Sequence, residues 1–475
     1  MGRCALFGHP LVAVIAIGAL LALTCGSDQV DVPQNSTVTL PKDKFYAILH
    51  NVLLRDQSIL VYPGEDSDHL QQQVRHVFEH RAWWPNFSKW TADVVTQTNA
   101  TQYPDKCARW VDTPVVLWSG MPVDHENTFH WFTDDIMRVF ATLVDTGLLD
   151  LETAIDRDWE PSSEEAKVIL LQLHPASWTS KFHELFDHLT PDQWSFPHGV
   201  GACYRTLIVG ADNESACYTY SADQKQQETR TRNQLRFRRW AMAKQLQIDD
   251  RKGHSIEQPP GPNGKIQIRL VSRNRNDRGS RAIVNEDEIM AAIVEQYSDI
   301  ADVHLINFNS SLSTAMLAMN ATDVLIGMHG AGMTNLLWMR PGGAVLQLMP
   351  YAWRSTITPP APPPAATLFE QLSYNANASY FLWENFKAEH AYFNREQYAS
   401  TASRASHEER KAMHAYKEHP DEEWAKELKQ FRPDGQLYDH WKAQDTYVDL
   451  RTFMPLVHEA MAAVRKNNKA WAASQ

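Results

Sequence analysis

The sequence predicts an α/β protein with two Rossmann-like domains, and three observations lead to that expectation. The chain has 475 residues, more than one hydrophobic core commonly holds. From residue 265 onward, apolar strand patterns alternate with helical patterns, and a looser alternation precedes residue 224. Alternation of this kind is typical of a doubly wound, parallel sheet.

The second half of the chain carries the clearer pattern. Buried strands are expected at 266–272, 303–308, 324–328 and 344–349, and helices at 286–297, at 311–321 and in a segment opened by Gly332. Ligands of such sheets bind beyond the carboxyl ends of the strands. We therefore expect the functional residues of this half in the loops that follow its strands.

The first half and the connections are less regular. Strands are expected at 114–118, 167–173 and 204–209, and helices at 129–144, 182–189 and 224–247. A Pro/Gly-rich linker is expected at 258–264, and an amphipathic helix at 455–464 with Pro455 at its first position. The predicted division is a leader at 1–27, an N-terminal Rossmann-like domain at 28–255, a C-terminal one at 256–447, and a segment at 448–475 that packs back across both.

The N-terminus predicts entry into the secretory pathway. An apolar run at residues 11–23 follows a short segment whose only charged side chain is Arg3, and it is either a cleaved signal peptide or a short signal-anchor. In both cases the remaining chain would be lumenal or secreted. Seven N-glycosylation sequons suit that compartment, at Asn35, Asn86, Asn99, Asn213, Asn309, Asn320 and Asn377.

Net charge and cysteine content limit the ligands and the disulfides that can be expected. A net charge of −12 argues against general nucleic-acid binding. Cys107, Cys203 and Cys217 lie beyond the leader, so at most one disulfide can form among them. Proximity in sequence favours the pair Cys203 and Cys217.

A glycine-rich loop follows the strand at 324–328 and holds His329, Gly330, Ala331, Gly332, Met333, Thr334 and Asn335. Glycines let backbone N–H groups close around an anion at the start of a helix, so the loop predicts a phosphate-bearing ligand. The alternative is a tight turn in which glycine serves packing alone.

Arginines follow the first strand of the same half. Between Ser272 and Arg281 there are four, and Arg suits a diphosphate better than Lys because its guanidinium binds two oxygens at once. The alternative is a solvated basic loop. We expect these arginines and the His329 loop to meet over one edge of the sheet.

An acidic helix is the third candidate. Glu126, His130 and Asp134 have the spacing i, i+4, i+8, which places a histidine between two carboxylates on one helix face, and Asp135 follows. Such groups can accept a proton from an attacking hydroxyl, whereas the alternative is a merely solvated face. No convincing metal signature accompanies them, since the Asp156-Arg-Asp158 triplet lacks an apolar strand before it.

At these residues the chain resembles glycosyltransferase family 61. The segments that carry the resemblance are 272–273, 281–286, 323–335 and 341–347, with Asn127-Thr-Phe-His130, Asp134-Asp135, Cys203-Tyr-Arg205 and 448–453 as further blocks. The resemblance implies a GT-B fold, with the two domains facing across a cleft, and an inverting transfer from a UDP-sugar with no metal or other cofactor. It implies that Arg273 and Arg281 face the diphosphate, that the loop from His329 to Asn335 lies beneath it, and that Gln347 contacts the ribose.

The expected function is an inverting transfer of GlcNAc, or of a pentose such as xylose or arabinose, to a hydroxyl of a glycoprotein glycan or polysaccharide in the Golgi or endoplasmic reticulum. Asp134 or Asp135 ranks first as the base and His130 next. Two alternatives remain: an inactive secreted sugar- or nucleotide-binding glycoprotein of the same fold, and a lumenal sulfotransferase-like enzyme.

Overall fold

The computed structural model describes part of the chain. The described residues are 30–31, 36–41, 46–55, 58–62, 91–94, 106–107, 109–118, 128–149, 169–172, 202–211, 223–249, 264–273, 281–351, 368–393 and 444–474. Contacts divide the chain into two compact units. Unit 1 is Met1–Leu117, Ala166–Leu171 and Gln193–Gly210, and unit 2 is Trp118–Glu165, Gln172–Asp192 and Ala211–Gln475. Among the helices in the described ranges, none is long and apolar enough to cross a membrane.

Unit 1 is built around a mixed sheet. Its described strands run in the order β5-β4-β3-β10-β8-β9, while β2 pairs with β3 and β7 with β10. Their bounds are β2 (Thr37–Thr39), β3 (Tyr46–Arg55), β4 (Ser58–Val61), β5 (Thr91–Val94), β7 (Arg109–Val111), β8 (Val115–Trp118), β9 (Ile169–Gln172) and β10 (Ala202–Gly210). The three strands expected from sequence are present as β8, β9 and β10.

The sheet of unit 1 is not wholly parallel, because β3 runs antiparallel to its neighbours. This strand is antiparallel to β10, to β2 and to β4, whereas β7 and β8 are parallel to β10. Only residues 56 and 57 separate β3 from β4, and a two-residue connection can join antiparallel strands alone. A fully parallel Rossmann sheet is therefore not what the described strands of unit 1 form.

The disulfide of unit 1 joins Cys107 to Cys203, with 5.8 Å between their Cα atoms. The expected pairing of Cys203 with Cys217 is therefore wrong. Strand β6 (Lys106–Cys107) pairs with β1 (Val30–Asp31), and Cys203 lies on β10 beside Trp110 of β7. Closeness in the fold, across 96 residues of sequence, decided the pairing.

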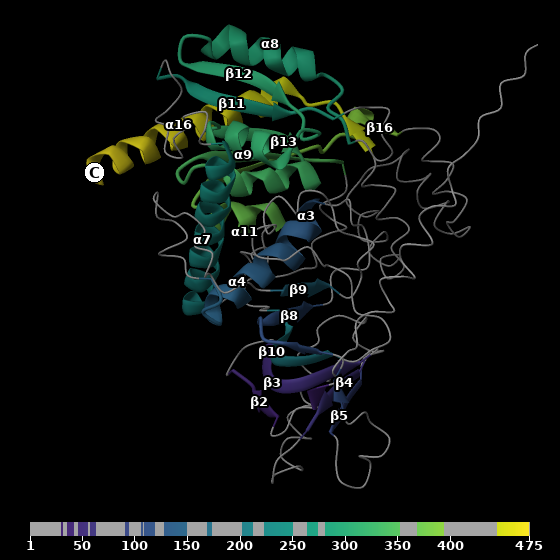
Figure 1. Ribbon diagram of the computed structural model, residues 1–475. Coiled ribbons are helices and arrows are strands. Elements are labelled where there is room, and N and C mark those ends of the chain that lie inside the picture. Colours follow the sequence, from purple (N-terminus) through teal and green to yellow (C-terminus); the bar gives the residue numbers. More distant parts are fainter. Residues whose placement is uncertain are drawn as a thin grey trace, which may run out of the picture. The chain divides into compact units, whose positions relative to one another are not determined.

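Unit 2 contains the predicted parallel sheet, in the order β12-β11-β13-β14-β15 (Figure 1). The strands are β11 (Ile266–Val271), β12 (Ala301–Ile306), β13 (Val324–Met328), β14 (Ala344–Met349) and β15 (Ser379–Glu384), and each neighbouring pair is parallel. The predicted bounds of β13 and β14 are confirmed, and β12 begins two residues earlier than expected. The crossover helices α8 (Glu286–Tyr297) and α9 (Leu312–Asn320) are also where the sequence predicts them.

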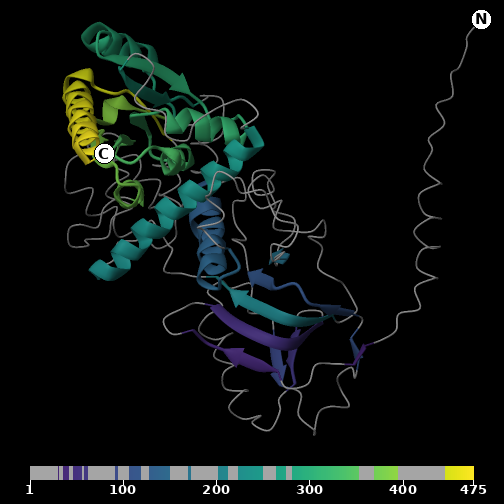
Figure 2. The same cartoon turned by 60° about the vertical axis from the view of Figure 1, so that its left-hand side comes forward.

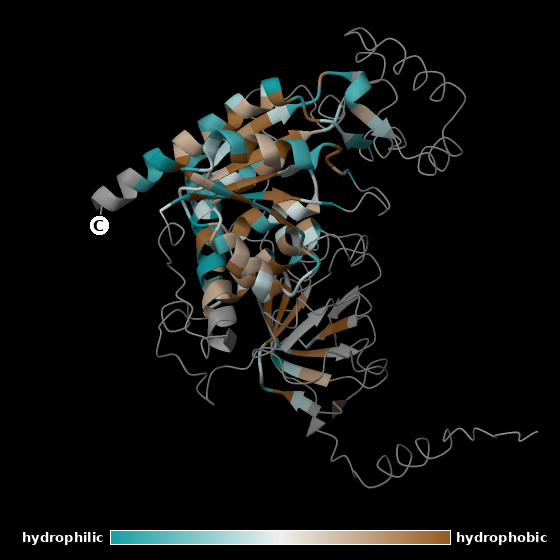
Figure 3. Ribbon diagram, turned by 90° about the horizontal axis from the view of Figure 1, so that it is seen from above, coloured by the Kyte–Doolittle hydropathy of each residue, from teal (hydrophilic) through white to brown (hydrophobic). Residues whose placement is uncertain are grey.

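Alternation along the strands sends successive side chains to opposite faces of this sheet. Ile268, Ile326 and Leu346 belong to the core on the face covered by α8 and by α16 (Leu450–Ser474). Figure 2 shows α16, in yellow, lying against this sheet, and the strands in Figure 3 are largely brown. Gln347, one residue along from Leu346, therefore lies on the other face.

The other face is covered by helices from two distant parts of the sequence. The 3₁₀ helix η7 (Ala331–Trp338) contacts α9, α11 (Leu368–Asn375) and α7 (Gln224–Asp249). The segment formed by α3 (Thr128–His130), the π-helical turn η4 (Trp131–Ile136) and α4 (Met137–Asp145) packs on these through aromatic rings. Ring centroids are 5.2 Å apart for Phe132 and Trp338, and 5.3 Å for Phe140 and Phe237. The acidic helix thus groups with the parallel sheet of unit 2, although the domain boundaries at 255 and 447 stay a prediction.

The C-terminal helix is longer than expected and contains its proline. Helix α16 begins at Leu450, so Pro455 lies inside it rather than at its first position. Proline lacks the N–H that would reach the carbonyl of Arg451, and Arg451 and Pro455 both lie on the exposed side of the helix. The start is fixed by Asp449, whose side chain accepts from the backbone N–H of Arg451 at 3.1 Å.

Several expectations lie outside the described residues. These are the leader at 1–27, the helix at 182–189, most of the linker at 258–264, Glu126, Asp156 and Asp158, and the arginines between 274 and 280.

Candidate functional site

The glycine-rich loop begins where β13 ends, at the carboxyl edge of the parallel sheet. Gly330 has a φ of 152°, and a Cβ added to it would collide with the guanidinium of Arg273 and lie 2.8 Å from Nη1 of Arg281. Both arginines thus pack directly on the loop. The sequence-based expectation that they meet over one sheet edge is confirmed in its geometry.

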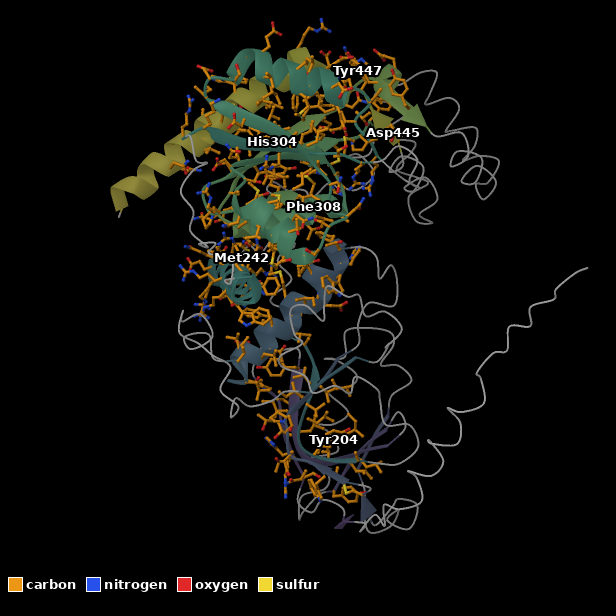
Figure 4. The ribbon with its side chains drawn as sticks, turned by 45° about the horizontal axis from the view of Figure 1, so that its top comes forward. Tyr204, Met242, His304, Phe308, Asp445 and Tyr447 are labelled. Carbon is orange, nitrogen blue, oxygen red and sulfur yellow. A yellow bond between two sulfur atoms is a disulfide. The ribbon has the colours of Figure 1, made fainter. Side chains whose placement is uncertain are left out.

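Arg281 is held by its backbone as well as by its side chain. Its φ of 47° is in the left-handed region, which is uncommon for a residue with a Cβ. Its Nη1 donates to the carbonyl of His329 at 2.7 Å. The next residue, Ala282, donates its N–H to Asp445 at 2.7 Å, so the segment labelled at Asp445 and Tyr447 in Figure 4 anchors the strained turn.

Arg273 is partly enclosed where it packs on the loop. Desolvation by burial lowers the pKa of Arg273 from its usual value, and an arginine remains cationic after such a shift. A buried cation beside a second guanidinium favours the binding of an anion, because water screens the two charges less than it does at the surface. The arrangement therefore suits a phosphate or diphosphate group.

Backbone groups complete the anion-binding edge. Helix η7 starts with Gly330 as its N-cap, and the N–H groups of Ala331 and Gly332 have no acceptor within the helix. A Cβ on Gly332 would lie 3.3 Å from Val271 and 3.6 Å from Phe308, labelled in Figure 4. The amide of Asn335 donates to the carbonyl of Gly332 at 3.0 Å, so Asn335 stabilises the conformation of the loop.

Thr334 and Met333 lie behind the loop and are fully buried. Within the described part of the chain, the hydroxyl of Thr334 has no hydrogen-bond partner. A buried hydroxyl without a partner costs roughly 1–3 kcal/mol. Such a cost marks Thr334 as a residue to test for function.

His329 is fixed by a relay of three side chains. Tyr380 on β15 donates its hydroxyl to Oε1 of Gln347 at 2.7 Å, and Nε2 of Gln347 lies 2.6 Å from Nδ1 of His329. Gln347 is completely buried on β14. The sequence indicated Gln347 but not Tyr380, because only the pairing of β14 with β15 brings them together.

The acidic helix reaches the same loop through aromatic rings. The ring of His329 meets Phe369 edge-on at 5.0 Å, Phe369 meets Phe129 at 5.4 Å, and Phe129 meets His130 at 5.3 Å. His130 is half-buried. Phe129 and Phe369 were not predicted as site residues.

The predicted i, i+4, i+8 spacing does not hold along this segment. Residues 131–136 form a π-helix, whose turn is wider than that of an α-helix, and Glu126 lies outside the described residues. Asp135 is 6% exposed, and only the backbone of Asp134 is described. π-Helical turns are frequent at functional sites.

Metal and glycan sites can be tested only where the structure describes the chain. No group of three His, Cys, Asp or Glu side chains gathers as a metal site among those residues, and independence of metal stays a prediction. Asn309 and Asn377 are exposed. Asn320 is 6% exposed and accepts from Arg238 at 2.7 Å, so this sequon has no room for a glycan in the folded chain. The sequons Asn35, Asn86, Asn99 and Asn213 lie outside the described residues.

Comparison with known proteins identifies a family model and several relatives of this chain. Residues 128–346 match the family model described as Glycosyltransferase 61. The bovine protein O-linked-mannose beta-1,4-N-acetylglucosaminyltransferase 2 is 24% identical over 269 residues, which are 54% of this chain and 41% of that protein. The rice beta-1,2-xylosyltransferase XYXT1 is 25% identical over 272 residues, 56% of this chain and 50% of that protein.

A shorter match has higher identity. The Drosophila melanogaster EGF domain-specific O-linked N-acetylglucosamine transferase is 36% identical over 88 residues, which are 18% of this chain and 16% of that protein. The matched regions thus span half or less of these curated relatives. The family region includes the helix of His130, both arginines and the His329 loop, and the chain therefore carries a glycosyltransferase 61 domain at residues 128–346.

Proposed function

We propose that this protein is an inverting glycosyltransferase that moves GlcNAc, or a pentose such as xylose or arabinose, from a UDP-sugar to a hydroxyl of a glycoprotein glycan or polysaccharide. The observation that carries the proposal is the packing of Arg273 and Arg281 on Gly330 at the carboxyl edge of the parallel sheet. Relatives named as N-acetylglucosaminyl- and xylosyltransferases support the sugar classes.

In this proposal the leaving UDP is stabilised by fixed charges and dipoles. As the bond from the anomeric carbon to the diphosphate oxygen breaks, negative charge grows on that oxygen. Arg273 and the N–H groups of Ala331 and Gly332 stabilise this charge without rearrangement, because the loop and Arg281 already hold one another. His329 forms part of the floor of the site on the ribose side of the nucleotide, and the buried Gln347 positions its ring.

The acceptor hydroxyl needs a base. Asp134 and Asp135 on the π-helical turn η4 rank first, and His130 on the preceding turn ranks next. The aromatic contacts from Phe129 through Phe369 to His329 support their placement near the donor loop. A well-placed general base contributes about 10²–10⁴-fold to the rate.

The proposal includes a GT-B arrangement, a secretory-pathway location with a signal peptide or type II anchor, and a reaction that needs no metal. The parallel sheet of unit 2 supports the nucleotide-binding half of that fold.

The test is UDP release by the full-length protein across UDP-GlcNAc, UDP-xylose and UDP-arabinose, with and without chelator. We expect one donor to dominate, and Arg273→Ala to lower turnover about 10²-fold, as loss of one charge-stabilising group commonly does. Asp134→Asn, Asp135→Asn and His130→Gln are compared in parallel, and Arg465→Ala on the exposed side of α16 is the control. If UDP binds but no variant or donor gives turnover, the inactive binding protein is the correct reading. If adenosine bisphosphate displaces UDP, the protein is instead the sulfotransferase-like enzyme.

A further inference from the structure

A second groove lies in unit 2 at the other end of the sheet from Gly330. It has a volume of about 1170 Å³ and is bounded by α7, α11 and the segment that enters β15. Pro341, Ala378 and Ser379 line it, and these residues precede or begin β14 and β15. The groove therefore opens at the amino ends of the strands and is distinct from the loop described above.

One wall of this groove carries a row of arginines. Arg232, Arg236 and Arg239 have the spacing i, i+4, i+7, which places them on one face of α7, and all three are exposed. The row spans about 10 Å along the helix at 1.5 Å per residue. In a chain with a net charge of −12, such a local row of cations stands out.

Within the described ranges, neighbouring carboxylates do not neutralise these three cations. Among the described residues, no ion pair holds Arg232, Arg236 or Arg239. Arg232 donates to the hydroxyl of Thr229 at 3.4 Å. Two acidic residues, Glu228 and Glu370, also line the groove, and Glu228 accepts from Gln224 at 2.9 Å. The groove thus keeps an excess of positive charge.

The remaining lining suits a sugar. Tyr374 is 62% exposed at the groove, and an aromatic ring offers a flat apolar face with a polar tip. Two amides also line the groove, those of Gln227 and Gln371, and both are fixed because they donate to Oδ1 of Asn375, at 2.7 and 3.3 Å. Pockets that combine an aromatic face with fixed polar groups orient polar ligands.

We propose that this groove binds an acidic oligosaccharide, with carboxylates or sulfates of successive residues along Arg232, Arg236 and Arg239 and one sugar ring on Tyr374. A single phosphate would engage one arginine and leave the others without a counter-charge. A polyanion with repeated charges matches a row of this length, and the amides of Gln227 and Gln371 match hydroxyl groups. The site does not depend on the donor reaction proposed above.

The test is binding of defined probes to the full-length protein by calorimetry. The probes are an oligogalacturonate hexamer, a heparin-derived hexasaccharide, neutral xylohexaose, a hexaglutamate peptide and inorganic phosphate. Asn377 lines the groove within a sequon, so all proteins carry Asn377→Gln to keep a glycan from covering it. We expect one acidic saccharide to bind at least tenfold more tightly than xylohexaose and the peptide, and more weakly as salt rises.

Variants decide where the probe binds. Replacement of Arg232, Arg236 and Arg239 by Gln should weaken binding at least tenfold, and Tyr374→Ala should weaken it severalfold. Both should leave UDP release unchanged. The matched control replaces Arg465 and Lys466 by Gln on the exposed side of α16, and should keep full binding. No saccharide binding, equal loss in the control, or tighter binding of hexaglutamate would each overturn the proposal. Thermal unfolding of every variant checks that it is folded.

Discussion

Nε2 of Gln347 lies 2.6 Å from Nδ1 of His329, and this contact sets which ring nitrogen carries the proton. Oε1 of Gln347 already accepts from Tyr380, so its amide nitrogen faces the imidazole and donates to Nδ1. The proton of the neutral ring is then on Nε2. A buried glutamine thus makes His329 a donor at the edge away from β14.

Replacing Gln347 by Glu should move that proton. A carboxylate can only accept, so it favours a proton on Nδ1 of His329. Nitrogen-15 NMR of the two ring nitrogens should report a change from the Nε2–H to the Nδ1–H form, while Tyr380→Phe, which keeps the amide, should leave the tautomer unchanged. An Nδ1–H signal in the unaltered protein would contradict the assignment.

Gly330→Ala should weaken UDP binding by at least tenfold, which corresponds to about 1.4 kcal/mol. The added Cβ would push on the guanidinium of Arg273 and on Arg281. Gly342→Ala is the matched control, because Gly342 also has a positive φ, of 90°, but its Cβ would meet only Asn467, at 3.4 Å. Both variants should lose stability through backbone strain, and calorimetric titration should find the UDP defect in Gly330→Ala alone.

Thr334→Val separates a structural role from a functional one. The side chains have the same shape, and removal of a buried hydroxyl without a partner should leave the free energy of unfolding unchanged or raise it by about 1–3 kcal/mol. We expect turnover to fall nevertheless, because a buried hydroxyl that costs stability is retained in the loop that we propose to bind UDP. Denaturant unfolding and UDP release are measured on the same preparation, and unchanged turnover would assign Thr334 to packing.

Asp449 makes stability depend on acid. Hydrogen bonds from Arg451, and then from Lys387, lower the pKa of Asp449 well below its usual range. A carboxyl group with a lowered pKa in the folded state stabilises the protein above its unfolded value of 3.8, and this stabilisation is lost as the pH falls further. Asp449→Asn keeps a capping side chain but removes its charge, and should cost about 1 kcal/mol at neutral pH, because hydrogen bonds to a charged acceptor contribute more than those to a neutral one. Unfolding curves should show a constant difference from pH 5 to 7 that shrinks below pH 3.8, and a difference that persists in acid would rule out the ionised cap.

Loss of the disulfide should destabilise unit 1. Cys107→Ser with Cys203→Ser removes a bond that closes 96 residues, and removal of such bonds commonly costs about 2–5 kcal/mol. Cys217→Ser is the control and should leave both stability and the bond intact. Peptide mapping without reductant checks the pairing, and a Cys203–Cys217 peptide would contradict it.

Sequence patterns predicted unit 2 better than unit 1 for a physical reason. A parallel sheet buried on both faces gives continuous apolar runs such as 324–328 and 344–349, separated by helices with their own period. In unit 1 the strands predicted from sequence begin at residue 114, so the prediction lacked β3, the strand that makes the sheet partly antiparallel.

Some residues of the candidate site could likewise be predicted from the sequence, and others could not. His329, Gly330 and Arg273 could be predicted because they follow two strands of a parallel sheet, whose carboxyl ends lie at the same edge. Tyr380, Phe369 and the π-helical turn at 131–136 could not, since strand pairing and ring packing between distant segments decide them.

The two coverings of the parallel sheet also constrain the order in which a nascent chain can fold. On one face, Phe140 of α4 can contact Phe237 of α7 only after nearly a hundred further residues have been synthesised. On the other face, α16 is synthesised only after β15. Contacts so distant in sequence form slowly, because the chain between them loses conformational entropy before the contacts can stabilise it. The surface of β14 and β15 that α16 covers therefore stays exposed until residues 450–474 are made, and production of the protein should depend on chaperones that shield that surface until α16 docks.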